Sequence, residues 1–93
     1  MNRELFQNAL DGYHSLANGI MEGNPEHIQT VRQMLWMLGT SDDQNVRENL
    51  LAANQAAFRK YAEGPLDDLL GGLTALRRLA EQYLALEDQS EHP

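Results

Sequence analysis

Cysteine is absent from the chain, which excludes several kinds of chemistry at once. Without a thiol there is no disulfide, no thiolate nucleophile and no cysteine-ligated zinc site. The absence fits a reducing compartment, where disulfides are rare. Long apolar runs are also missing, and the first residues lack the apolar core of a secretory signal peptide. We therefore expect a soluble cytoplasmic protein with no membrane segment.

Basic residues are few, with seven Lys and Arg against 14 Asp and Glu and a formal net charge of −7. They are scattered apart from the pairs Arg59-Lys60 and Arg77-Arg78, and no aromatic residues are interleaved with them. A nucleic-acid backbone or an anionic membrane surface repels a protein with this overall charge. We expect neither direct nucleic-acid binding nor membrane binding.

Proline is also scarce, at three residues in 93, while 42% of the residues are hydrophobic. This composition is typical of a folded chain, and its length allows one hydrophobic core. We predict a single helical domain over residues 1–88 and a disordered tail over residues 89–93. A chain of this size buries about two thirds of its unfolded surface, so association with a second copy would add stability.

Apolar residues recur every three or four positions along the chain, whereas the alternating pattern of a strand is missing. Gly23-Asn24-Pro25 and Gly64-Pro65 are typical of a helix end followed by a helix start. Ser41 and Gln44 are the two ends of a capping box. We predict an all-α fold, a small antiparallel bundle of four helices at about residues 3–21, 25–38, 42–63 and 65–88.

Four glycines lie inside these predicted helices, where each costs about 1 kcal/mol relative to alanine. Gly12 and Gly19 lie seven positions apart on the first helix, and either close approach of a second helix or simple tolerance explains them. Gly71-Gly72 could kink the last helix or split it in two.

The last predicted helix has an apolar arc of about 200°, which is wider than contact with one neighbour requires. Its partners could belong to the same chain or to a second copy, because each helix of a four-helix monomer also touches two others. We favour a homodimer. The predicted dimer interface consists of Leu69, Leu73, Leu76, Ala80 and Tyr83.

Two apolar residues of the second predicted helix lie outside its stripe. Met34, Leu35 and Leu38 supply the stripe, whereas Trp36 and Met37 point elsewhere. Trp is enriched in interface hot spots and Met adapts to varied surfaces. We predict a partner-binding surface formed by Trp36 and Met37 with the second apolar ridge of the third helix, Leu51 and Phe58. The alternative is that the turn after Gly39, a neighbouring helix or a second subunit covers these side chains.

Catalytic and metal-binding patterns are scarce. Asp11 and His14 have a spacing usable for a metal on a helix, but no second such pair exists, so a solvated helix face is expected. Gly71-Gly72 follows no strand and does not form a phosphate-binding loop. Arg77 interrupts the apolar arc of the last helix, and we expect its aliphatic stem to lie along that arc. We predict no enzyme activity, no metal and no cofactor.

One short stretch resembles a known family. Residues 41–44, then Arg47, Asn49-Leu50-Leu51 and Gln55-Ala56, resemble a segment of type III secretion gatekeeper subunits. A capping box followed by an amphipathic helix produces most of this pattern, and the long last helix has no counterpart in that family. We assign no family from it.

The sequence therefore predicts a small acidic all-helical protein that binds and regulates or inhibits another protein. Immunity proteins, anti-regulators, secretion chaperones and phage-encoded inhibitors are chains of this kind. The alternative is an acidic mimic of nucleic acid that blocks a DNA- or RNA-binding protein. A small all-helical enzyme, with arginines facing an anionic substrate, is the third possibility.

Overall fold

Helices α1 (Asn2–Met21) and α2 (Pro25–Gly39) begin the fold, and a three-residue turn connects them. The computed structural model describes residues 2–40 and 55–91. Gly23 has φ 74°, a left-handed conformation that suits glycine. The Asn24 Oδ1 atom accepts hydrogen bonds from the backbone N–H groups of Glu26 at 3.0 Å and His27 at 3.4 Å. The predicted helix end, N-cap and helix start at this turn are confirmed.

Helices α4 (Gln55–Glu63) and α5 (Leu66–Glu91) complete the described chain. The prediction of a helix over residues 42–63 is confirmed for its last nine residues, and residues 42–54 lie outside the described part. Helix α5 continues through Gly71-Gly72 without a break. It also ends three residues beyond the predicted end at 88, so residues 89–91 of the predicted tail are helical. No proline or glycine interrupts that segment, whereas residues 92–93 lie outside the described range.

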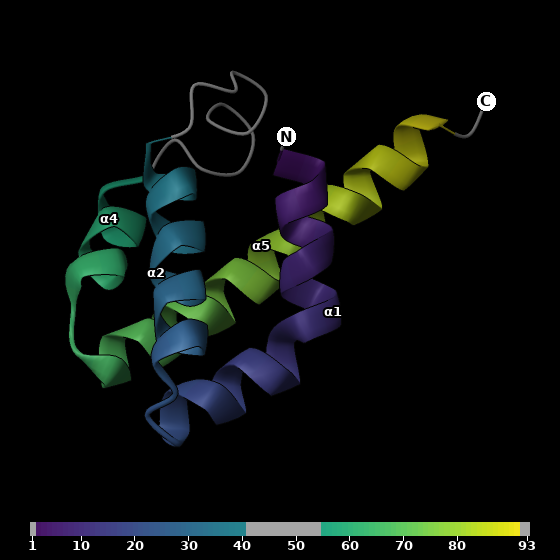
Figure 1. Ribbon diagram of the computed structural model, residues 1–93. Helices are drawn as coiled ribbons and strands as arrows, with labels where there is room; N and C mark the ends of the chain where they lie inside the picture. The colour runs from purple at the N-terminus through teal and green to yellow at the C-terminus, as the bar shows by residue number, and fades with distance from the viewer. Residues whose placement is uncertain (1, 41–54, 92–93) are drawn as a thin grey trace.

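Successive helices reverse direction, and α5 begins beyond the end of α4 and runs obliquely past α2 and α1 (Figure 1). Helix α1 packs chiefly on α5, and α2 packs chiefly on α4. The molecule is elongated, with extents of 45 × 24 × 17 Å, because the C-terminal turns of α5 extend past α1 (Figure 1). No strand occurs among the described residues. The predicted fold class, a small all-α antiparallel bundle, is confirmed.

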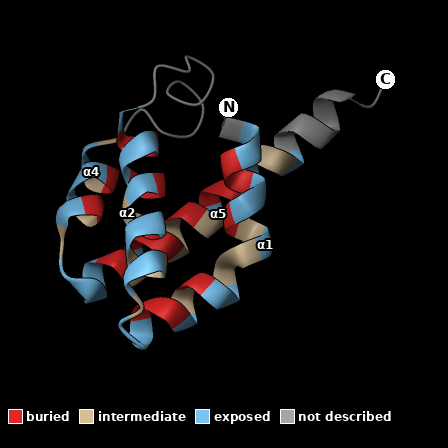
Figure 2. Ribbon diagram, viewed as in Figure 1, coloured by how far each residue is buried: buried red, intermediate tan, exposed pale blue. Residues whose placement is uncertain are grey.

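One hydrophobic core joins all four helices. Figure 2 shows that buried residues lie on the sides of the helices that face one another. The largest fully buried side chains come from α1, α2 and α5: Phe6, Ile20, Val31, Leu35, Leu38, Leu69, Leu73 and Leu76. Most of the apolar arc of α5 is therefore covered by the other helices of its own chain, while Leu66 at the start of the helix is exposed.

Close helix contacts occur at glycines. A Cβ atom at Gly72 would lie 2.7 Å from both Leu35 Cδ1 and Tyr61 Cβ. Helices α2 and α4 therefore contact α5 closely at this position, where α5 has no side chain. Near the connecting turn, the His27 ring occupies the space beside Gly19 that a Cβ atom would need. Close approach therefore explains Gly19 and Gly72. A Cβ atom at Gly12 would make only ordinary contact with Leu16 of the same helix, and one at Gly71 would meet nothing within 4 Å, so these two glycines are tolerated instead.

Candidate functional site

The last turns of α2 present Trp36 and Met37 to solvent. Trp36 is 45% exposed and Met37 is 55% exposed, whereas Met34, Leu35 and Leu38 are buried in the core. The helical period explains the difference, because three of these five residues suffice to cover the core-facing side of the helix. The two surplus apolar residues are therefore placed as the sequence predicts.

Trp36 lines a shallow groove between α2 and α4. The groove has a volume of about 320 Å³, and its other lining residues are Gln29, Arg32, Gln33, Ala62 and Glu63. The indole and the Ala62 methyl group supply apolar surface, while the amides and the two charged groups supply hydrogen-bonding partners. Such a mixture of one large aromatic group and a polar surround is typical of a protein-interaction surface.

Arg32 holds the two walls of this groove together. Its Nη1 atom donates to the carbonyl oxygen atoms of Ala62 at 3.0 Å and Gly64 at 2.8 Å. These carbonyls lie at the C-terminal end of α4, where backbone acceptors lack partners within the helix. A cation is also favourable at this end of a helix. The groove beside Trp36 is thus held in shape without a ligand.

Met37 belongs to a different side of α2. Adjacent residues of a helix point about 100° apart. Trp36 shares its side with Arg32 and Gln29, which face the groove toward α4. By the same period, Met37 shares its side with Met34 and Thr30. The two exposed residues therefore flank α2 instead of forming one patch.

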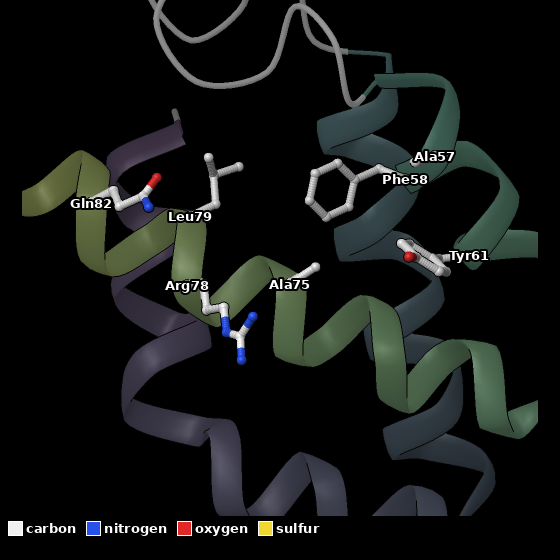
Figure 3. A pocket seen from close by; sticks show the side chains of 7 residues that line it. All are labelled: Ala57, Phe58, Tyr61, Ala75, Arg78, Leu79 and Gln82. Carbon is white, nitrogen blue, oxygen red and sulfur yellow. The ribbon is translucent and has the colours of Figure 1, made fainter.

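Phe58 is largely withdrawn from solvent, at 3% exposure, and packs in the core. Its ring centroid lies 6.3 Å from that of Tyr61, with the ring planes at 73°. Part of the ring lines a second groove, of about 250 Å³, between α4 and α5. Figure 3 shows Phe58 and Tyr61 from α4 facing Ala75 and Leu79 from α5 across it.

The predicted partner-binding set is therefore divided. Trp36 and Met37 are exposed, Phe58 is a core residue at the edge of another groove, and Leu51 lies outside the described residues. Sequence reasoning also missed Arg32 and Ala62. The positions of Gln29, Arg32, Gln33 and Trp36 on one side of α2 are visible in the sequence, but their proximity to the end of α4 is not.

The predicted dimer interface coincides with the core of the single chain. Leu69, Leu73, Leu76 and Ala80 are all at 0% exposure, buried against the other helices. Tyr83 is half-buried, and its ring centroid lies 4.7 Å from that of Phe6, at 55° between planes. The four fully buried side chains are not available to a second subunit in this fold, whereas Tyr83 keeps part of its surface exposed. Those four residues therefore belong to the core of the single chain, while a place for Tyr83 in an interface and the homodimer itself stay predictions.

The polar residues weighed as catalytic candidates lie apart or pair with neighbours. Asp11 accepts a hydrogen bond from Gln7 at 3.1 Å, and the His14 ring lies edge-on to Tyr13 at 5.5 Å. The Arg77 guanidinium lies 4.5 Å from the centre of the Tyr13 ring, and its Nε atom is 3.2 Å from Glu81 Oε1. In the described ranges, no three His, Asp or Glu residues are grouped to hold a metal ion.

None of the described helices combines the length and the apolar character needed to cross a membrane. Comparison of the chain with protein-family models, with curated proteins and with solved structures gave no match.

Proposed function

We propose that this protein is a small acidic all-helical interaction module that binds a partner protein and regulates or inhibits it. The observation that carries the proposal is the exposure of Trp36 at 45%, beside a groove whose walls are held together by Arg32. Burying an exposed indole under a partner lowers the free energy of the complex. Trp is also among the residues that dominate binding free energies.

The two other function classes receive less support. A nucleic-acid mimic needs carboxylates gathered on one face, whereas the described ones are distributed over α1, α2, α4 and α5. An enzyme with an anionic substrate needs arginines that converge on a pocket. Among the described arginines, Arg32 and Arg59 donate to backbone carbonyls and Arg77 pairs with Glu81.

The proposal is tested with Trp36→Ala in two steps. The unmodified protein and the variant are used as baits in the native host, and proteins retained by the first but not the second are identified by mass spectrometry. The affinity of the purified partner is then measured for both. We expect a loss of at least about 2 kcal/mol, which corresponds to about 30-fold in Kd.

Met21→Ala is the matched control, because Met21 is 66% exposed at the end of α1. We expect it to leave partner affinity unchanged. The melting temperature of both variants should stay close to that of the unmodified protein, since neither side chain fills the core. A loss of about 3–5 kcal/mol of stability in Trp36→Ala, with intrinsic affinity unchanged, would assign Trp36 to the fold and contradict the proposal.

A further inference from the structure

A third groove lies between α1 and α2, on the side of α2 away from the Trp36 groove. Its volume is about 360 Å³, and its lining includes Gly12 and Ser15 of α1 and Thr30 of α2. Its floor is apolar and consists of Leu5, Leu16 and Met34, each of which retains between 7% and 9% exposure. These core side chains can be reached from outside through the groove.

The packing of the two helices explains why the groove is open. Helices α1 and α2 touch closely near their connecting turn, where His27 packs on Gly19. Further along, α1 is held to α5 by the Phe6–Tyr83 ring contact and by the Tyr13–Thr74 hydrogen bond of 3.1 Å. Helix α2 is held to α4 instead, where Arg59 donates to the carbonyl of Gly39 at 3.0 Å. Because each helix has a different neighbour, the pair separates (Figure 1).

At Gly12 the α1 wall of the groove has no side chain. A Cβ atom there would meet only Leu16 of its own helix, at 3.6 Å, which is ordinary contact. The wall from Leu5 to Leu16 spans about 16 Å at the rise of an α-helix. It is therefore long enough for two to three turns of a second helix, and the missing side chain permits close approach.

The charges around the groove are mostly acidic. No charged residue lines it. Glu4 and Asp11 on α1 and Glu26 on α2 are exposed, and in the sequence each lies within four residues of a residue that lines the groove. The single arginine of α1, Arg3, does not line the groove, but it lines a neighbouring pocket together with Glu4, Gln7 and Asn8. The single arginine of α2, Arg32, binds the carbonyls at the end of α4. A ligand with basic residues beside an apolar strip is thus complementary to this surface.

A helix suits the groove better than an extended segment. Both walls are helices, whose backbone N–H and C=O groups are bonded internally and offer no partners to an extended chain. A bound helix satisfies its own backbone groups and places apolar residues at i, i+3 or i+4, and i+7 in the groove.

We propose that the α1–α2 groove binds an amphipathic helix of a partner protein, with an apolar stripe flanked by Lys or Arg residues. The site is separate from the Trp36 groove and does not depend on it.

The probe is a synthetic helical peptide of about 15 residues with leucines on one face and lysines on both flanks, labelled with fluorescein. A second peptide carries glutamate in place of every lysine. Binding to the full chain is followed by fluorescence anisotropy. We expect the lysine peptide to bind at least about tenfold more tightly than the glutamate peptide, and added salt to weaken it.

Gly12→Leu tests the location, with Gly71→Leu as its matched control. Both are mid-helix glycines at which a Cβ atom would come no closer than 3.6 Å to a neighbouring side chain, but only Gly12 lines the groove. We expect Gly12→Leu to weaken lysine-peptide binding at least about tenfold and Gly71→Leu by less than about twofold, with melting temperatures maintained in both.

Asp11→Lys provides a second test, because this residue is exposed and its replacement leaves the core unchanged. This substitution should weaken binding of the lysine peptide and strengthen binding of the glutamate peptide. Equal affinities for the two peptides, or a Gly12→Leu variant that binds as tightly as the unmodified protein, would overturn the proposal. Failure of the lysine peptide to bind would also overturn it. The same holds if the detergent dodecyl maltoside binds in the groove but the lysine peptide does not.

Discussion

Neighbouring residues of identical type have different surroundings in this fold. Gly71 is exposed and has nothing within 4 Å of the position that a Cβ atom would take. Gly72 is buried, and the same construction places Tyr61 Cβ and Leu35 Cδ1 only 2.7 Å away. One glycine is therefore required by packing, whereas the other only lowers helix propensity.

We predict opposite effects of alanine at these two positions. Gly71→Ala should raise the free energy of unfolding by up to about 1 kcal/mol, because alanine favours the helix and meets no neighbour. Gly72→Ala should lower it by about 1–3 kcal/mol, because the new methyl group forces α4 away from α5. Urea denaturation of both variants measures the difference. Equal changes of the same sign would show that the two sites do not differ in packing.

At the scale of single elements, α4 depends on its neighbours. The nine described residues of α4 are too few to form a stable helix by themselves in water. Helix α4 is held near its middle by Arg59, which donates to Gly39 of α2, and at its C-terminal end by Arg32 of α2, which donates to the Ala62 and Gly64 carbonyls. Phe58 and Ala62 bury its inner face.

We predict that Arg32→Met lowers the free energy of unfolding by about 1–3 kcal/mol, because two carbonyls at the end of α4 lose a charged donor. Methionine keeps most of the aliphatic stem, so the loss of stability measures the contribution of the guanidinium group. Arg78→Met, at an exposed position of α5, is the control and should have little effect. Hydrogen exchange locates the change. Faster exchange confined to helices other than α4 would contradict this role of Arg32.

For the whole molecule, the central question is how the wide apolar arc of α5 is covered. Leu69, Leu73 and Leu76 are fully buried by residues of the same chain. Large apolar side chains remain exposed elsewhere, at Met21, Trp36, Met37 and Leu66. A homodimer would therefore have to use surface residues such as these, at the cost of bringing together two chains of net charge −7.

We predict that Leu73→Ala lowers the free energy of unfolding by about 2–5 kcal/mol, because it leaves a cavity where α5 meets the core. The loss should be independent of protein concentration over about a hundredfold range, as expected for a core residue. Thermal unfolding at several concentrations measures it, and light scattering gives the mass. The opposite result is a melting temperature that rises with concentration in the unmodified protein but not in Leu73→Ala. It would show that Leu73 lies in a subunit interface.

Much of the fold is predictable because its signals are local. The capping residues Asn24-Pro25 and the Gly64-Pro65 pair act within one turn of themselves, so the sequence alone determines where these helices begin. The apolar period likewise determines which side of each helix is buried. The same period places Trp36 and Met37 outside the stripe of α2, and the structure shows that both are exposed.

The partners of each buried side were decided only by the tertiary structure, because helical periodicity gives the direction of a side chain but not what covers it. The arc of α5 fits another chain or its own, and contacts distant in sequence select its own. The same holds for Arg32, whose acceptors lie 30 and 32 residues away. It holds as well for the α1–α2 groove, which exists because α1 packs on α5 and α2 packs on α4.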